Sequence, residues 1–166
     1  YARGLEDGRF PVVSWIADRP PQVNPEQWQL EINGAVSTPK AFKLSELQAR
    51  SLTQQTATLD CTGGWYTIQD WEGVSISELL KEAGALDTAV SITVRSVTGY
   101  KRRFSLKEAN TYILALNMSN EPLSQGHGYP VRLIAFDKRG VEWVKWVDEI
   151  QVNTTSKIWQ SPLPLQ

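Results

Sequence analysis

The residues best suited to chemistry lie in one stretch that holds the only cysteine of the 166-residue chain, Asp60-Cys61-Thr62-Gly63-Gly64-Trp65. The preceding residues 54–59 are polar and β-branched and predict a short strand, and Gly63-Gly64 breaks that pattern. We therefore expect Cys61 at the start of a loop leaving a strand end, where functional side chains are often placed. A lone cysteine is also commonly a small buried hydrophobe, but adjacent glycines let a backbone come close to a ligand.

A second polar stretch, Gly126-His127-Gly128-Tyr129-Pro130-Val131-Arg132, contains the only histidine. His127, Arg132 and the later Lys145 are cationic or donor groups of the kind that binds a phosphate. A histidine between glycines is equally typical of a solvated turn, and most lysines are exposed. The residue types alone leave both interpretations open.

The composition is that of a folded protein with about one domain, with 41% hydrophobic and 21% charged residues. A net charge of −1 gives no basic surface for nucleic acid, so no nucleic-acid partner is predicted. One cysteine excludes an internal disulfide, and no apolar run approaches the roughly 20 residues of a membrane span. Because the chain starts at Tyr1 rather than Met, we expect a processed product or a soluble domain cut from a longer protein.

The elements that must position these residues are strands separated by short helices, which indicate an α+β fold with mixed β-sheets. Strands are predicted near residues 28–32, 54–59, 90–97, 100–104, 112–116, 131–136 and 150–152. Capping boxes predict helices after Ser45, Ser75 and Ser105, each with Gln or Glu three residues on. Apolar residues at helical spacing extend the second helix to Ala83, and Gly84 ends it. Residues 1–27 are proline-rich and predict an extended arm packed on the domain at 28–153, and residues 154–166 predict a tail.

The motifs come in an order and spacing that resemble the molybdopterin-binding domain of the sulfite oxidase family. They are the Cys61 stretch, Trp71-Glu72-Gly73-Val74, Glu121-Pro122-Leu123, the His127 to Arg132 stretch and Val144-Lys145-Trp146. The resemblance covers roughly residues 10–153 and is nearest to bacterial members that consist of this domain alone. It implies the family's α+β fold and a mononuclear Mo-molybdopterin cofactor that transfers an oxygen atom to or from the substrate.

The resemblance also implies the site residues. Cys61 matches the cysteine whose thiolate coordinates molybdenum, and a soft thiolate suits such a metal. The predicted cofactor contacts are Ser14, Trp15, Cys61, Thr62, Gly63, His127, Arg132, Trp143, Val144 and Lys145. Cys61 and Tyr100 are the predicted catalytic residues.

Three departures from the sulfite oxidases bear on the substrate. Val13-Ser14-Trp15 stands near the place of an Arg-Asn-His segment, no basic residue lies in 62–66, and Thr98 replaces an acid found in many relatives. An anion such as sulfite needs local positive charge, so a small S- or N-oxide is predicted instead.

Two other classes of function are open: a cofactor-free binding or interaction module that keeps the fold, and a carbohydrate-binding β domain marked by the seven tryptophans. With one histidine and no Cys-x-x-Cys-His, the chain binds no haem. Electrons are then expected to pass to a separate electron-transfer protein or a membrane haem partner. The resemblance further implies an extracytoplasmic location, periplasmic or at the cell surface, with a membrane tether upstream of Tyr1.

Overall fold

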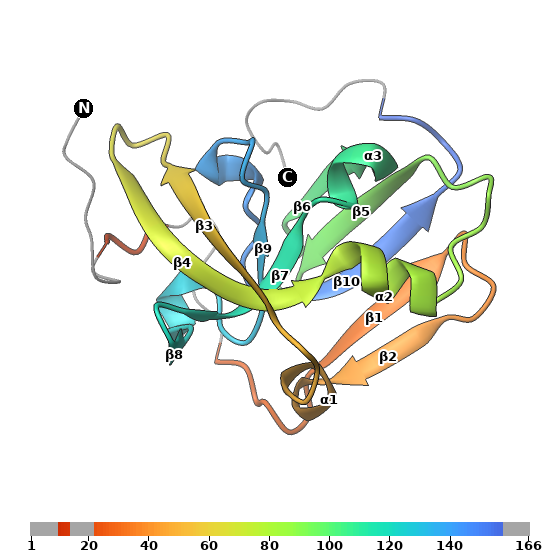
Figure 1. Cartoon of the computed structure of the whole chain (residues 1–166), viewed down its shortest axis with the longest axis horizontal. Helices are drawn as coiled ribbons and strands as arrows, with labels where there is room; N and C mark the ends of the chain where they lie inside the picture. Colours follow the sequence, from red (N-terminus) through yellow and green to blue (C-terminus); the bar gives the residue numbers. More distant parts are fainter. Residues whose placement is uncertain (1–9, 14–21, 158–166) are drawn as a thin grey trace.

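The computed structural model describes residues 10–13 and 22–157 and consists of two five-stranded sheets with short helices (Figure 1). The first sheet has the strand order β2-β1-β10-β5-β6. Only its β1–β10 pairing is parallel, which makes this sheet mixed as predicted. Its strands are β1 (Gln29–Gly34), β2 (Lys40–Lys43), β5 (Ser91–Ser96), β6 (Lys101–Ser105) and β10 (Val147–Asn153).

The second sheet is antiparallel and carries the cysteine at its end. Its order is β3-β4-β7-β8, and β9 pairs with β7. Its strands are β3 (Thr53–Asp60), β4 (Tyr66–Ser75), β7 (Ile113–Met118), β8 (Glu121–Pro122) and β9 (Arg132–Ile134). The β3–β4 hairpin is long and curved in Figure 1, and its tip lies on the same side of the molecule as residues 10–13.

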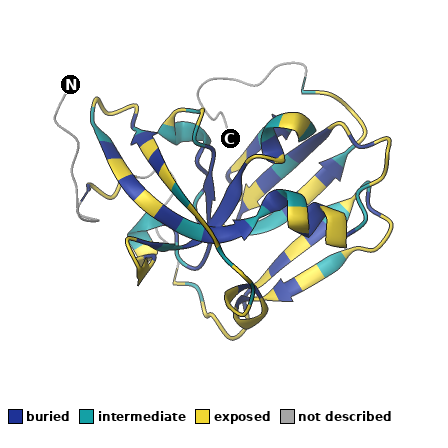
Figure 2. Ribbon diagram, in the orientation of Figure 1, coloured by how far each residue is buried: buried dark blue, intermediate teal, exposed yellow. Residues whose placement is uncertain are grey.

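Helices connect the sheets rather than forming a layer of their own. They are α1 (Leu44–Gln48), α2 (Ile76–Glu82), α3 (Leu106–Ala109) and two 3₁₀ turns, η1 (Gln125–His127) and η2 (Gly140–Glu142). No helix within residues 22–157 is long and apolar enough to cross a membrane. Figure 2 shows buried and exposed residues alternating along the strands, so each sheet turns one face toward the common core.

Local predictions met different outcomes. The capping box at Ser105 is confirmed, because Glu108 N donates to Ser105 Oγ and Ser105 N donates to Glu108 Oε2. The box predicted at Ser75 is wrong, because the Ser75 side chain bonds Ser77 instead of capping α2. The box predicted at Ser45 is also wrong: the first helix begins at Leu44, two residues earlier than predicted, with Lys43 as its N-cap, and Glu46 accepts from the backbone of Lys43. The predicted strand 131–136 is shorter, since only Arg132–Ile134 pair with β7.

Candidate functional site

A cavity of about 110 Å³ lies at the tip of the β3–β4 hairpin. Segment 10–13, η1, the start of β9 and the loop after β9 complete its walls. Residues far apart in the sequence therefore share one site. The lining side chains and backbone come from Phe10, Pro11, Val13, Leu59, Cys61, Thr62, Trp65, Tyr100, Gly126, His127, Arg132, Gly140, Val141, Trp143 and Lys145.

Cys61 leaves the end of β3, where the sequence predicted it. Its backbone N–H donates to Trp65 O (2.9 Å), and Gly64 N donates back to the Cys61 carbonyl (3.2 Å). Gly64 adopts a φ of +83°, which closes this tight turn at little cost for a glycine. Gly63 N lies 3.4 Å from Cys61 Sγ. A buried sulfur thus lines the cavity with a backbone donor beside it.

Arg132 begins β9 and is 4% exposed. Its Nη1 donates to the His127 carbonyl (3.0 Å), and its guanidinium lies 5.5 and 5.8 Å from the ring centroids of Trp71 and Trp143. Burial lowers the pKa of Arg132 to about 10, and the electrostatic influence of the nearby Cys61 opposes this shift. The side chain is therefore still charged at neutral pH. Its Nε is buried and has no hydrogen-bond partner among the described residues.

His127 and Lys145 hold segment 10–13 against the cavity. His127 Nε2 lies 3.1 Å from the Phe10 carbonyl, which can only accept, so Nε2 carries the proton. The Phe10 ring packs on the imidazole with centroids 4.2 Å apart. Lys145 Nζ donates to the carbonyls of Val13 and Gly126, both at 2.9 Å. Two of the three predicted phosphate donors, His127 and Lys145, are thus engaged by backbone carbonyls in this structure.

The environment of His127 favours its neutral form. Burial is the largest cause that lowers its pKa, and the nearby charges of Arg132 and Lys145 act in the same direction. The hydrogen bond to Phe10 opposes this shift. Ser124 Oγ lies 2.9 Å from Nδ1 and completes the pairing of the ring. The histidine is consequently a half-buried, fixed group and not a solvated turn residue.

Of the remaining predicted site residues, some line the cavity and others do not. Tyr100 and Trp143 are buried in the cavity wall, and Thr62 lines it from an exposed position. Gly63 contributes its backbone N–H near the sulfur. Val144 is fully buried among core residues and its carbonyl accepts from Leu133 N (2.8 Å). Ser14 and Trp15 lie outside the described residues.

The structure adds residues that the sequence analysis missed, above all Arg139. Its Nη2 lies 3.4 Å from the Cys61 carbonyl, and its Nε lies 3.7 Å from Asp60 Oδ2. The adjacent Gly140 packs closely, since a Cβ there would come within 3.1 Å of the Asp60 carbonyl. The cysteine loop has no basic residue of its own, yet the fold places this arginine beside it. No sequence signal links positions 78 residues apart.

The donor set fits a metal-pterin cofactor with a phosphate. A thiol in reach of a soft metal and a buried arginine with an unused donor share one cavity with a lysine and a histidine. The cavity is smaller than the roughly 300–1,000 Å³ of typical ligand pockets. Segment 10–13 forms one of its walls.

Fold and site together define a cofactor-binding oxidoreductase domain of the sulfite oxidase type. The sequence model of the oxidoreductase molybdopterin-binding domain matches residues 17–159, and the chain belongs to that family. The family's cofactor is Mo-molybdopterin.

Solved and curated relatives agree with this assignment. The sulfane dehydrogenase SoxCD from Paracoccus pantotrophus superposes with a TM-score of 0.78 at 25% identity, over 83% of this chain and 42% of that one. The uncharacterized oxidoreductase YuiH of Bacillus subtilis (strain 168) is 26% identical, over 86% of this chain and 73% of its own length. The NADH nitrate reductase of Spinacia oleracea is 26% identical over 81% of this chain. The chain spans only 18% of that nitrate reductase.

Proposed function

We propose that the protein catalyses oxygen-atom transfer at a mononuclear Mo-molybdopterin centre to which Cys61 supplies a thiolate ligand. The observation that carries this proposal is the shared cavity of the cysteine sulfur and the buried Arg132, whose Nε has no hydrogen-bond partner in the described chain. When bound, the cofactor supplies the two-electron redox chemistry. The protein contributes positioning and electrostatics.

The cavity residues divide this work between them. Arg132, Lys145 and His127 would hold the pterin phosphate; without it, His127 bonds the Phe10 carbonyl and Lys145 bonds the carbonyls of Val13 and Gly126. The backbone N–H of Gly63 points a donor at the cysteine sulfur. The Tyr100 hydroxyl donates to the Val141 carbonyl. We therefore assign Tyr100 the role of an aromatic wall beside the substrate rather than that of an acid.

The substrate that suits this cavity is a small S- or N-oxide rather than sulfite. Leu59, Trp65, Tyr100 and Val141 give an apolar and aromatic lining, which suits a neutral, mildly polar molecule. Arg139 adds a charge near the cysteine, but Asp60 lies 3.7 Å from its Nε and offsets that charge. Electrons pass to a separate redox protein, and the location is extracytoplasmic. The support for the redox partner and for the location is the resemblance of the sequence to the sulfite oxidase family.

The test is a pair of assays on holoprotein made in a host that synthesises molybdopterin. Reduction of dimethyl sulfoxide or trimethylamine N-oxide with an artificial donor should be fast, and oxidation of sulfite should be slow. Rapid sulfite oxidation with no S- or N-oxide reduction would refute the substrate class. Protein that binds no molybdenum in this host would instead point to the cofactor-free binding module.

The carbohydrate-binding alternative finds no support in the positions of the five tryptophans that the structure describes. Trp28, Trp71, Trp143 and Trp146 are at most 5% exposed, and Trp65 is half-buried in the cavity wall. Glycan platforms need exposed aromatic faces. These side chains serve the core and the cavity.

A further inference from the structure

The loop after β9, residues 137–145, builds one wall of the cavity. It contributes Gly140, Val141, Trp143 and Lys145 to the lining. Apart from the single turn η2 it has no regular secondary structure. Backbone bonds such as that from Leu133 N to the Val144 carbonyl hold part of it, and side-chain contacts from outside the loop add to them.

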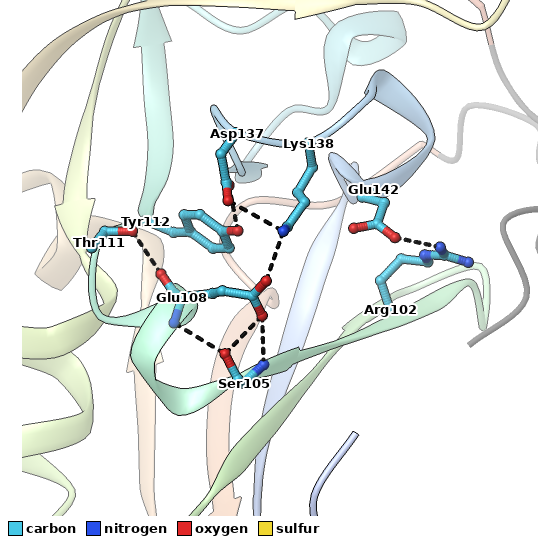
Figure 3. A network of polar contacts seen from close by, with 8 residues as sticks. All are labelled: Arg102, Ser105, Glu108, Thr111, Tyr112, Asp137, Lys138 and Glu142. Carbon is cyan, nitrogen blue, oxygen red and sulfur yellow. Dashed lines mark hydrogen bonds and ion pairs between the residues drawn. The ribbon is translucent and has the colours of Figure 1, made fainter. Parts of the chain in front are cut away.

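Two such contacts hold the first half of the loop (Figure 3). Tyr112 Oη donates to Asp137 Oδ1 at 2.6 Å. Lys138 Nζ lies 2.6 Å from Glu108 Oε1 and 3.2 Å from Asp137 Oδ2. Although partial burial opposes the shift, hydrogen bonds from Lys138 and Ser105 lower the pKa of Glu108 to about 2, so this carboxylate is charged at neutral pH.

Two contacts from β6 and the residue before it hold the second half. Arg102 Nη2 lies 2.6 Å from Glu142 Oε1, and the Arg102 side chain is 2% exposed. Tyr100, two residues earlier on the same inward face, bonds the Val141 carbonyl. The neighbouring loop positions 141 and 142 are thus attached to alternate residues of one sheet edge.

The free energy of folding alone does not explain the buried Arg102–Glu142 pair. The desolvation of two charges costs several kcal/mol each, and apolar replacements of such pairs are often neutral or stabilising. Its position in the loop suggests another role. Glu142 directly precedes Trp143, whose ring lies 5.6 Å from Trp71 and 5.8 Å from the Arg132 guanidinium. A shift at residue 142 would therefore reach the buried cation of the cofactor site.

We infer that Arg102 and Glu142 are positioning residues of the cofactor site, which act by holding Trp143 against Arg132. Neither touches the cavity; the pair fixes the wall that does. This inference rests on the assignment of the cavity to the cofactor. It adds a residue pair that no cysteine-centred motif contains.

The test replaces the pair by apolar residues of similar size, Arg102→Met with Glu142→Leu, and follows molybdenum and pterin content against time after removal of free cofactor. The double variant should unfold at the wild-type temperature or above, yet lose cofactor at least about 10-fold faster, the lower end of the 10- to 100-fold loss of affinity caused by mutating residues that support metal ligands. The matched control is Arg50→Met with Glu82→Leu. It removes an ion pair of 2.7 Å on the surface and should leave cofactor retention unchanged.

A second readout needs no cofactor. In the apoprotein the amides of Glu142 and Trp143, which donate to Arg139 and Gly140 carbonyls, should exchange hydrogen faster in the double variant than in the wild type and the control. If the double variant does not fold, Arg102→Lys keeps the charge but not the planar fork, and it should show the same effects to a smaller degree.

Two results would overturn the inference: a folded double variant that keeps cofactor as the wild type does, or an Arg102→Lys protein identical to the wild type in both readouts. Absence of molybdenum from the wild type itself is a different outcome. It would count against the proposed function. Hydrogen exchange in the apoprotein would then still test whether the Arg102–Glu142 pair holds the loop in place.

Discussion

Replacement of Arg132 by methionine separates a ligand-binding role from a structural one. In the apoprotein the change removes one hydrogen bond from a charged group, worth about 1.5–3 kcal/mol, and two cation–π contacts near the distance limit, worth about 0.5–1 kcal/mol each. It also removes a buried cation that has no acidic partner among the described ion pairs, and burial of a charge costs several kcal/mol. These terms nearly cancel, so apoprotein stability should change by less than about 2 kcal/mol.

The holoprotein should respond very differently. Truncation of one partner of a buried charged pair costs about 2–5 kcal/mol, so the cofactor should bind roughly 30- to 4,000-fold more weakly. Calorimetric unfolding of apo and holo samples, with molybdenum and pterin content, measures both effects.

Arg102→Met is the matched comparison, because that arginine is equally buried but ion-paired. Breaking its pair with Glu142 should cost the apoprotein about 3–5 kcal/mol. The reasoning is refuted if Arg132→Met destabilises the apoprotein as much as Arg102→Met does, or if it retains cofactor like the wild type.

Three further predictions concern pH and packing. Burial lowers the pKa of His127 below its ordinary value of 6.5, so on acidification the unfolded chain binds a proton at this histidine before the folded chain does. Apoprotein stability should therefore fall as the pH drops below about 6.5. In urea titrations His127→Gln should flatten this dependence of stability on pH. The pKa of Glu108 is about 2 in the fold against 4.5 ordinarily, so its contribution is complete above pH 4.5 and is lost as the pH falls toward 2; Glu108→Gln should remove this acid-side loss, and an unchanged acid profile would contradict it. Gly73→Ala should destabilise by about 3 kcal/mol or more, because the new Cβ would lie 2.0 Å from the Leu114 carbonyl; a thermal shift of only one or two degrees would show that the strands can separate.

Predictions from the sequence succeeded where a structure depends on residues close together in the chain. Ile76, Leu79, Leu80 and Ala83 recur at helical spacing and are all buried along α2 and its C-cap. Gly84 ends the helix as predicted, with a φ of +66° in the left-handed region. Residues 54–59 lie within β3 and deliver Cys61 to a strand end.

The sequence analysis missed β4, and the reason is chemical. Two of its inward positions are Thr67 and Gln69, which are polar yet at most 3% exposed. Gln69 Nε2 donates to Thr67 Oγ1 at 2.7 Å, and Gln69 Oε1 accepts from Ser119 Oγ at 3.0 Å. Buried polar residues hide the apolar alternation by which a strand is recognised. No strand is therefore predicted over Tyr66–Ser75, and Trp71-Glu72-Gly73-Val74 stands out only as a motif.

The sequence predicts those residues of the site that lie in short motifs, but not the contacts that hold them. Cys61, His127, Arg132 and Lys145 stand in short stretches whose residue types and order are informative, and the fold brings all four to one cavity. The contacts that hold them come from distant parts of the chain. Arg102 and Glu142 are 40 residues apart, and Phe10 and His127 are 117 apart. Such pairings depend on the tertiary fold and leave no local pattern.

The most direct test of the central claim compares molybdenum and pterin content per chain, and the metal's redox signal, in wild type and Cys61→Ser protein from a molybdopterin-producing host. We predict about one molybdenum per wild-type chain. In the variant the metal signal should be altered or lost, while the apoprotein stays folded because the sulfur packs beside a loop and not in the centre of the core. An unaltered metal signal in Cys61→Ser would contradict the assignment of the cysteine as the ligand.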